Sequence, residues 1–364
     1  MKKQKFILIA ILIIVLTLSA YYLYTSQDKS SELSIIFLGD TAFGESYNTG
    51  ILEQYGYDYS LENFNSMLED SDLVIANLET PITNFSTPAY PEKEYNHYSS
   101  PEYAGKALSD HNIKLVSLAN NHLMDFGTPG LEDTIKNLQE NNIIFTGAGL
   151  NEEKAIQPTI INFELKNKTF SLALISGFEF QETYNEYQFY SLNEAPGVLN
   201  LESPHIPLIM QEIKSSSPDT FLIIFPHWGE NYNWKTGKQQ ETAQKLVQAG
   251  ADMIIGHGAH TLQEIEKINN TTVIYSLGNF VFLSPGRYSA SETPPYSLIT
   301  RMIIKEDLVE FRLYPIKSDN LETNYQPGFA SKKEVESIKE TLIEKSPQLS
   351  LVIKKDKYGY YLTL

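Results

Sequence analysis

Six residues of types that bind divalent cations each follow an apolar run in this sequence. They are Asp40, Glu79, Asn121, His227, His257 and His260. Carboxylate, amide and imidazole groups are the ligands that hard and borderline divalent metals accept. Six ligands are enough for two ions, and Glu79 is our candidate for the carboxylate that bridges them. Two ions held about 3.5–4 Å apart can acidify a water molecule that attacks a substrate, so these residues favour hydrolytic chemistry.

Each candidate ligand also has a structural interpretation. Asp40 follows a glycine and could be an ordinary turn residue, and Asn121 could simply cap the next turn. His227 could be a buried, hydrogen-bonded histidine. The two histidines of the segment 256–260 are three residues apart and could share a helical face, but the glycines beside them favour a tight loop and metal ligation. Taken together in this order, the strand ends that carry these residues favour a metal site.

The residues before these ligands predict buried strands. Six apolar runs lack the alternation of a half-exposed strand, which suits strands that are buried on both faces. They are residues 35–38, 73–76, 114–118, 221–225, 253–255 and 273–277. Helical patterns separate several of them, at residues 61–68, 101–111, 131–140 and 241–249. This alternation predicts a largely parallel sheet, and the carboxyl ends of its strands would bring the polar residues together along one edge.

Four further segments alternate between apolar and polar residues, as strands with an antiparallel arrangement do. They are residues 159–165, 169–175, 297–304 and 308–314. The number of strands is then high enough for two sheets. A final helix is predicted over 331–344, opened by a capping box of Ser331 and Glu334. We therefore expect an α/β domain over residues 34–318 and a C-terminal extension with a helix over 319–364.

The composition excludes several classes of function. The chain has 364 residues, with 28 Lys+Arg against 45 Asp+Glu and a formal net charge of -17. Such a charge repels a phosphodiester backbone, so we expect no nucleic-acid partner. The chain has no cysteine, which excludes disulfides, a thiol nucleophile and thiolate-bound zinc.

The N-terminus predicts a membrane anchor. Lys2, Lys3 and Lys5 precede an uncharged apolar run from Phe6 to Tyr24, which is long enough to cross a bilayer. The positive-inside rule keeps the lysines in the cytoplasm, and no A-x-A cleavage signal follows, although cleavage after residue 20 stays an alternative. We expect residues 1–25 to form a single-pass anchor in the cell membrane, residues 26–33 a tether, and the C-terminal domain to be extracellular.

The polar segments, taken in order, resemble the CapA family of capsule poly-γ-glutamate synthesis proteins. They are Gly39-Asp40, Asn77-Leu78-Glu79, Ala119-Asn120-Asn121-His122, Asp125-Phe126-Gly127, His227-Trp228-Gly229-Glu230, Gly256-His257-Gly258-Ala259-His260 and Ser276-Leu277-Gly278-Asn279-Phe280. The family is related to the calcineurin-like metallophosphoesterases. The resemblance implies a four-layer α/β/β/α sandwich, which here would lie behind the N-terminal transmembrane helix.

The resemblance also implies a distribution of ligands over two metals. Asp40 and His260 would hold one ion, Asn121, His227 and His257 the other, and Glu79 would lie between them. The ions would be divalent, and Mn, Fe, Zn and Mg are all candidates. The related phosphoesterases usually have a histidine where this chain has Ala42, so the first ion would lose an imidazole ligand.

Catalytic and supporting roles follow from the same resemblance. His122 would be the general acid for the leaving group, and Asp125 would orient it. We expect six further residues to support the metals or contact substrate, namely Asn77, Asn120, Trp228, Glu230, Asn279 and His97. Trp228 could instead pack in the core, and Asn279 could only shape a turn. The tyrosine-rich stretch 184–190 could line a cleft or cover the core.

Two functions of different classes remain open. The first is a metal-dependent hydrolase or transferase that acts on a cell-surface polymer or its precursor during capsule poly-γ-glutamate synthesis or export. The second is a non-catalytic, metal-stabilised scaffold that assists capsule synthase subunits. A strongly acidic domain is a poor binder of a polyanion unless metals or a local basic patch compensate, and this favours the enzyme.

Overall fold

The computed structural model describes residues 22–24, 31–43, 49–282, 285–291, 293–306 and 308–364. The predicted membrane anchor lies outside these residues except for Tyr22–Tyr24, which form the short strand β1. Among the described helices, none is both long enough and apolar enough to cross a membrane.

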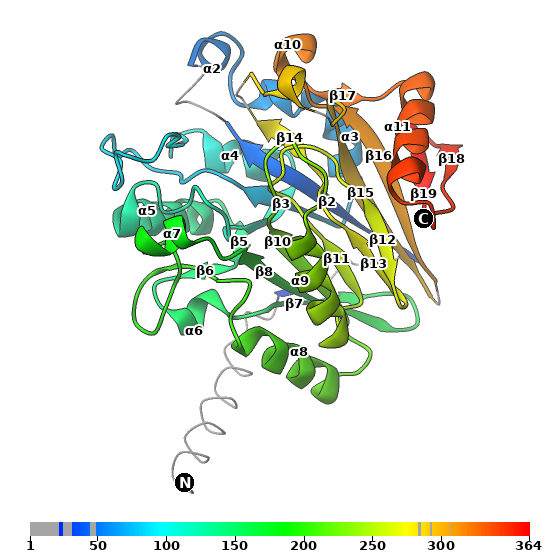
Figure 1. Cartoon of the computed structure of the whole chain (residues 1–364), viewed down its shortest axis with the longest axis horizontal. Helices are drawn as coiled ribbons and strands as arrows, with labels where there is room; N and C mark the ends of the chain where they lie inside the picture. The colour runs from blue at the N-terminus through cyan, green and yellow to red at the C-terminus, as the bar shows by residue number, and fades with distance from the viewer. Residues whose placement is uncertain (1–21, 25–30, 44–48, 283–284, 292, 307) are drawn as a thin grey trace, which may run out of the picture.

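Two large sheets form the centre of the molecule (Figure 1). The ten-stranded sheet has the order β18-β19-β16-β15-β2-β3-β4-β5, with β14 beside β2 and β17 beside β16. Its strands are β2 (Glu32–Ala42), β3 (Leu73–Leu78), β4 (Ile113–Ser117), β5 (Ile144–Thr146), β14 (Asn279–Phe282), β15 (Tyr296–Lys305), β16 (Leu308–Lys317), β17 (Gly328–Phe329), β18 (Val352–Lys355) and β19 (Tyr360–Thr363). The segment 319–364 thus contributes strands to the same sheet as β2.

The seven-stranded sheet has the order β1-β7-β8-β10-β11-β13-β12. Its other strands are β7 (Thr159–Glu164), β8 (Thr169–Phe178), β10 (Phe221–His227), β11 (Met253–Ile255), β12 (Ile265–Ile268) and β13 (Thr271–Ile274). Strands β2 to β5 run parallel, as do β8, β10, β11 and β13, while the pairs β7–β8 and β15–β16 are antiparallel. β6 (Ala148–Gly149) and β9 (Gly197–Val198) form a separate pair.

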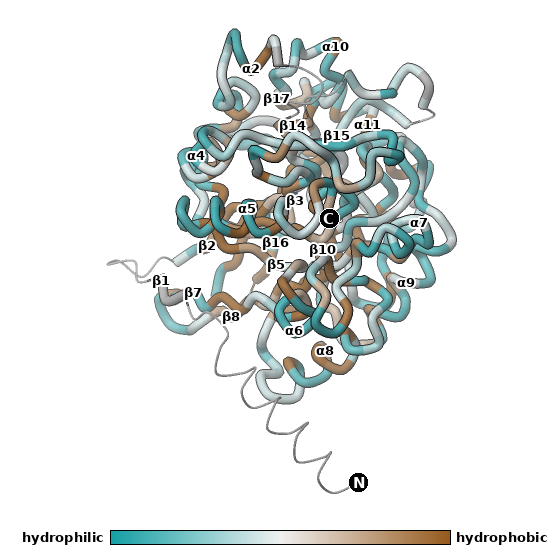
Figure 2. Tube along the Cα trace, turned by 90° about the vertical axis from the view of Figure 1, so that its left-hand side faces the viewer, coloured by the Kyte–Doolittle hydropathy of each residue, from teal (hydrophilic) through white to brown (hydrophobic). Residues whose placement is uncertain are grey.

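The apolar runs are continuous because each central strand is covered on both faces. In β2, Ile35 and Phe37 pack into the core between the two sheets, whereas Ile36 and Leu38 pack on the opposite face. In β10, residues 222–225 alternate in the same way between the inter-sheet core and an outer core. The hydrophobic residues accordingly concentrate along strands such as β2 and β8 (Figure 2).

Helices cover the outer face of each sheet. α4 (Ala104–Asp110) and α5 (Gly127–Glu140) pack on the ten-stranded sheet, and α8 (His205–Ser216) and α9 (Gly237–Gln248) pack on the seven-stranded sheet. The layers are therefore helix, sheet, sheet and helix, which confirms the predicted α/β architecture. α11 (Lys332–Lys345) opens with the predicted capping box. The remaining helices are short: α2 (Thr49–Tyr55), α3 (Asn65–Glu69), α6 (Glu152–Ala155), α7 (Glu182–Glu186) and α10 (Asn320–Thr323).

One glycine lets the backbone around the site close up. A Cβ atom on Gly39 would lie 1.8 Å from the carbonyl oxygen of Gly278, so only glycine fits between β2 and the segment before β14. The next residue, Asp40, donates its backbone N–H to that same oxygen at 3.0 Å. This contact fixes the end of β2 and hence the position of the Asp40 carboxylate.

Candidate metal centre

The carboxyl ends of the parallel strands bring the predicted metal ligands together. Asp40 lies in β2, Glu79 follows β3 directly, His227 is the last residue of β10, and the two histidines of segment 256–260 follow β11. Asp40 was expected after its strand but lies inside it, because pairing with β14 extends β2 to Ala42. Ala42 itself is buried at the end of β2.

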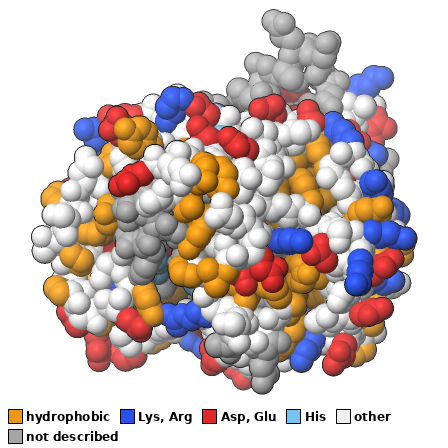
Figure 3. Space-filling model, turned by 90° about the horizontal axis from the view of Figure 1, so that it is seen from above, with side chains coloured by type: hydrophobic (Ala, Val, Ile, Leu, Met, Phe, Trp, Pro, Cys, Tyr) orange, Lys and Arg blue, Asp and Glu red, His pale blue; other side chains and the backbone are white. Residues whose placement is uncertain are grey.

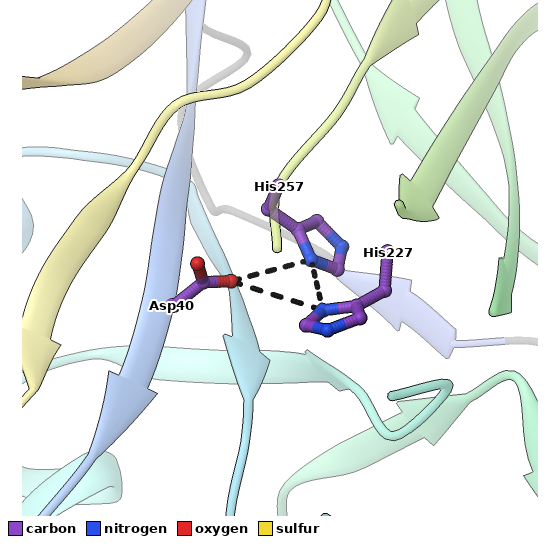
Figure 4. A group of neighbouring side chains, drawn as sticks. All are labelled: Asp40, His227 and His257. Atoms are coloured by element: carbon purple, nitrogen blue, oxygen red, sulfur yellow. Dashed lines mark hydrogen bonds and ion pairs between the residues drawn. The ribbon is translucent and has the colours of Figure 1, made fainter. Parts of the chain in front are cut away.

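Asp40, His227 and His257 form the first group of possible ligands (Figure 4). The Oδ1 atom of Asp40 lies 3.4 Å from Nδ1 of His257 and 3.9 Å from Nδ1 of His227. The two imidazole Nδ1 atoms are 3.1 Å apart. Three lone-pair-bearing groups therefore converge on one point, with their backbones on three different strand ends.

Asp40, Glu79 and His260 form the second group, so Asp40 belongs to both. The Oδ2 atom of Asp40 lies 3.5 Å from Nδ1 of His260, and Oε1 of Glu79 lies 3.8 Å from Nε2 of His260. The same Glu79 atom lies 3.7 Å from Nε2 of His227, which is in the first group. Both carboxylates thus face both groups. We call Asp40, Glu79, His227, His257 and His260 the metal-ligand cluster; all five are buried.

The segment after β11 is a tight loop rather than a helix. Gly258 has a φ of +105°, and a Cβ atom there would lie 3.1 Å from the ring of His227. Its backbone N–H donates to Oδ2 of Asp40 at 3.1 Å. His260 also adopts a left-handed conformation, with a φ of 59°. This backbone turns both loop histidines toward Asp40, as the flanking glycines indicated.

Three buried atoms at the site accept no hydrogen bond within the described part of the chain. They are Oε1 of Glu79, Nε2 of His257 and Oδ1 of Asn121. A buried polar atom without a partner is costly unless an ion or water satisfies it. The two oxygens are atom types that coordinate divalent cations, so the residues present fit a metal centre, and His257 faces Asp40 and His227 through its other ring nitrogen, Nδ1. Asn121 lies in the loop after β4, and its amide nitrogen donates to the hydroxyl of Tyr184 at 3.3 Å.

The two buried carboxylates have opposite pKa shifts. Burial and then the charge of Asp40 raise the pKa of Glu79 well above its usual range. Burial also opposes ionisation of Asp40, but the hydrogen bond from His257 and the charges of the nearby histidines hold its pKa below the usual range. Burial lowers the pKa of His227, which therefore stays neutral and able to coordinate. Without a cation, burial beside Asp40 therefore favours the protonated form of Glu79.

A second polar cluster lies beside the first and contains Lys93, His122 and Asp125; we call it the lysine cluster. Nζ of Lys93 forms an ion pair with Oδ1 of Asp125 and lies 3.0 Å from Nδ1 of His122. That Nδ1 atom is also 2.8 Å from Oδ2 of Asp125. The side chain of Lys93 is only 7% exposed, and that of Asp125 is fully buried.

Charge pairing decides which ring nitrogen of His122 is protonated. Nδ1 cannot both accept from Lys93 and donate to Asp125. Burial raises the pKa of Asp125 to about 6, against the lowering effects of Lys93 and His97, so this carboxylate is ionised at neutral pH. We therefore assign Nδ1–H as the donor to Asp125 and the lysine as the partner of the other carboxylate oxygen. This arrangement leaves Nε2 of His122 as the free nitrogen.

Three asparagines predicted to support the site make hydrogen bonds that position its residues. Asn77 donates to Oδ1 of Asp40 at 2.9 Å. The amide oxygen of Asn120 accepts from the backbone N–H of His122 at 3.1 Å, and its nitrogen donates to Oδ1 of Asn77 at 3.1 Å. Oδ1 of Asn279 accepts from Nδ1 of His260 at 2.9 Å, which leaves Nε2 of that ring free to coordinate.

The other three predicted residues lie at different distances from the chemistry. The ring of His97 is buried against that of His122, with centroids 3.8 Å apart, and its backbone N–H donates to Asp125. Trp228 is a core residue whose indole N–H donates to the carbonyl oxygen of Tyr275. Glu230 is exposed and accepts from Asn233 at 3.3 Å. Among the three, His97 is therefore the one packed against a predicted catalytic side chain.

Two cavities adjoin the clusters. The first, of about 500 Å³, is lined by residues that include His122, His260 and Lys93. The second, of about 470 Å³, reaches His227 from the other side, and Asn121 and Tyr184 line both. Within the tyrosine-rich stretch, Tyr184 thus lines the cavities, while residues 189 and 190 are buried. Both cavities therefore reach residues of the metal-ligand cluster.

Sequence reasoning missed Lys93 entirely. It lies in an irregular loop with no periodic pattern, so nothing in the sequence indicates that its ammonium group is buried. It missed the role of Tyr288 for the same reason: the hydroxyl of this buried residue donates to the backbone oxygen of His260. Both side chains become significant only when distant segments pack together.

Comparison with known proteins places the chain among capsule proteins. A family model described as bacterial capsule synthesis protein PGA_cap matches residues 34–284. The capsule biosynthesis protein CapA of Bacillus anthracis is 30% identical over 263 residues, which cover 70% of this chain and 61% of that protein. The PGA biosynthesis protein CapA of Bacillus subtilis strain 168 is 32% identical over 256 residues, covering 69% and 63%. The chain therefore spans less than two thirds of the length of these relatives.

Among solved structures, a calcineurin-like phosphoesterase from Bacillus subtilis aligns with 13% sequence identity and a TM-score of 0.47. The alignment covers 86% of this chain and 98% of that chain.

Proposed function

Because the chain belongs to the PGA_cap family of bacterial capsule synthesis proteins, we propose that it is a metal-dependent hydrolase or transferase. Its substrate would be capsule poly-γ-glutamate or a precursor of that polymer, and its partners would include capsule synthase subunits. The names of the Bacillus relatives support this pathway. The observation that carries the enzymatic part is the pairing of an electron-rich, incompletely satisfied ligand set with a separate histidine beside it.

Two divalent ions would be held by the metal-ligand cluster together with Asn121. Asp40 and Glu79 are the carboxylates that face both ligand groups, so either is placed to bridge. When bound, such ions acidify a water molecule and neutralise charge that develops on the substrate. The free Nε2 atom of His260, set by Asn279, supports this proposal because a metal needs an unprotonated imidazole nitrogen.

His122 would transfer the proton to the leaving group through Nε2. Its Nδ1–H is engaged by Asp125, so the ring cannot rotate away without losing that bond. Burial and then the charge of Lys93 lower the pKa of His122 well below its usual value. Nε2 is therefore unprotonated before the reaction, and His122 would act as the general acid after taking up at Nε2 the proton that the attacking water releases.

The test measures metal content and turnover in matched variants. Residues 26–364 are purified, their metal content is determined by mass spectrometry, and phosphoester and γ-glutamyl amide substrates are screened. His122→Ala should keep the metal and lower turnover by about 10²–10⁴-fold. Glu79→Ala should lose both metal and turnover.

The same variants distinguish the enzyme from a scaffold in cells. If the protein is an enzyme, the His122→Ala variant should make little capsule despite normal protein levels. If this variant makes normal capsule while Glu79→Ala makes none, the protein is a metal-stabilised scaffold and the catalytic proposal is wrong.

We further propose that Lys2, Lys3, Lys5 and the apolar run from Phe6 anchor the protein in the cell membrane with residues 26–364 outside. The charge asymmetry around the run supports this orientation. Protease added to intact cells should then digest the domain, whereas protection of the domain would remove the proposal.

A further inference from the structure

The cavity that opens beside His122 and His260 contains a cation that the proposed mechanism does not use. Arg287 lines this cavity and its side chain is exposed. The guanidinium carbon lies 4.8 Å from the centroid of the Tyr95 ring, so the planar cation stacks on the aromatic face. The guanidinium group also hydrogen-bonds the side chain of Tyr95, and it forms no ion pair with a carboxylate of the described residues.

The matching cation of the second cavity is already neutralised. Lys238 lines that cavity, and its ammonium group lies 2.8 Å from a carboxylate oxygen of Glu202 and 3.6 Å from one of Glu179. The two cavities adjoin the same metal-ligand cluster but offer different chemistry. In the second cavity Lys238 is paired with two carboxylates, whereas in the first Arg287 is paired with no carboxylate of the described residues.

The other charges of the first cavity do not compensate Arg287. Lys93 is paired with Asp125 inside the lysine cluster. Among the described residues that line the cavity, Glu94 is the only one with a carboxylate, and it hydrogen-bonds the hydroxyl of Tyr95. The protein carries a net charge of -17, and acidic and basic side chains are interspersed on the face in Figure 3. Attraction of an anion must therefore come from local groups.

We propose that Arg287, held on the ring of Tyr95, forms an anion subsite for a group of the substrate that does not react. The planar guanidinium fork suits a carboxylate or a phosphate, to which it can donate two parallel hydrogen bonds. Stacking on Tyr95 restricts the side chain in advance, which lowers the entropy lost on binding. The subsite rests on the proposed function, because it orients an anionic substrate toward the metal-ligand cluster, and it resolves how so acidic a protein binds a polyanion.

The test measures binding apart from turnover. A fluorescently labelled γ-glutamate oligomer is titrated into the full-length Glu79→Ala protein, in which the metal centre is removed, and anisotropy is recorded. Adding Arg287→Gln should weaken binding about tenfold, which corresponds to about 1.4 kcal/mol. Arg287→Lys should recover part of the loss. Lys238→Gln is the matched control and should leave binding unchanged, because its charge is already paired.

Competition identifies the anion. Glutarate and inorganic phosphate are each added to the bound oligomer; displacement by glutarate assigns a carboxylate subsite, and displacement by phosphate assigns a phosphate subsite. The proposal is overturned if neither anion displaces the oligomer, or if Arg287→Gln and Lys238→Gln weaken binding equally. If the wild-type protein shows no turnover, the proposed enzyme is contradicted. This binding result is unaffected, since binding is measured without the metal centre.

Discussion

The metal-ligand cluster and the lysine cluster solve the same physical problem in different ways. Both bury carboxylate and histidine side chains next to each other at the ends of parallel strands. In the lysine cluster the chain supplies its own cation, since Lys93 pairs with Asp125 and leaves each of their charges compensated. In the metal-ligand cluster, Asp40 and Glu79 face three histidines and contact neither lysine nor arginine among the described residues.

The difference indicates which cluster requires an external ion. Isolated buried charge is too costly to persist, so it must be paired, protonated or coordinated. The raised pKa of Glu79 indicates protonation as the metal-free solution, and a divalent cation would replace that proton. The lysine cluster needs no such replacement. The position of His122 in the self-compensated cluster therefore separates proton transfer from metal binding.

The largest expected effect is on the free energy of unfolding and comes from removing Lys93, the cation of the lysine cluster. Lys93→Met leaves the buried carboxylate of Asp125 without its partner, and the free energy of unfolding should fall by about 3 kcal/mol. The loss should be the same with and without metal, as measured by urea denaturation. Lys93 lowers the pKa of Asp125, which is about 6 in wild type, so this pKa is higher in the variant and the loss should shrink as pH falls toward about 6.

A double variant checks the cause of that loss. Adding Asp125→Asn to Lys93→Met removes the uncompensated charge, so much of the stability should return. A single variant as stable as the wild type, or a double variant no more stable than the single, would mean that the ion pair does not compensate the lysine cluster.

The second prediction is that Glu79→Gln raises stability without metal and lowers it relative to wild type with metal. In metal-free wild type the folded state binds a proton at Glu79 more tightly than the unfolded state, so stability should fall as pH rises above about 4.5. Glu79→Gln removes this fall and should stabilise the metal-free protein at neutral pH. With metal at 100 times its Kd, wild type should gain about 2.7 kcal/mol and the variant much less.

Thermal unfolding with and without chelator measures both halves of this prediction. Glu230→Gln is the matched control, because this glutamate is exposed and bonded to Asn233, and it should behave as wild type in both conditions. A variant that is destabilised equally in metal and in chelator would mean that Glu79 is not a metal ligand.

The sequence predicts the framework of the site better than its electrostatics. Uninterrupted apolar runs indicate strands covered on both faces, and their parallel order requires their polar ends to meet, as Asp40 and His227 do. These inferences depend on local patterns and on a general property of α/β sheets. The expected helix over 61–68 is divided in the structure into a 3-10 turn over Glu62–Phe64 and the short α3 that follows it directly.

The unpredicted parts depend on contacts between segments far apart in the chain. The last residue of β2, Ala42, pairs with β14, which lies 240 residues later in the sequence at Phe282. Arg287 stacks on Tyr95, and Lys93 reaches His122 from a loop without periodicity. Burial of a charged side chain depends on what packs over it, and a single sequence does not indicate that.

The smallest expected effect is on metal affinity and comes from Asn279, which lies at the edge of the metal-ligand cluster. Asn279 accepts the Nδ1 proton of His260 and so keeps Nε2 available, while its amide nitrogen lies 3.4 Å from the hydroxyl of Tyr288. Asn279→Ala should weaken metal binding about tenfold, because the ring can then rotate or change tautomer. Asn279→Asp keeps an acceptor and should retain most of the affinity, and Asn233→Ala, at an exposed asparagine, should retain all of it. Isothermal titration with the metal measures the three affinities, and unchanged binding in Asn279→Ala would mean that His260 does not coordinate the ion.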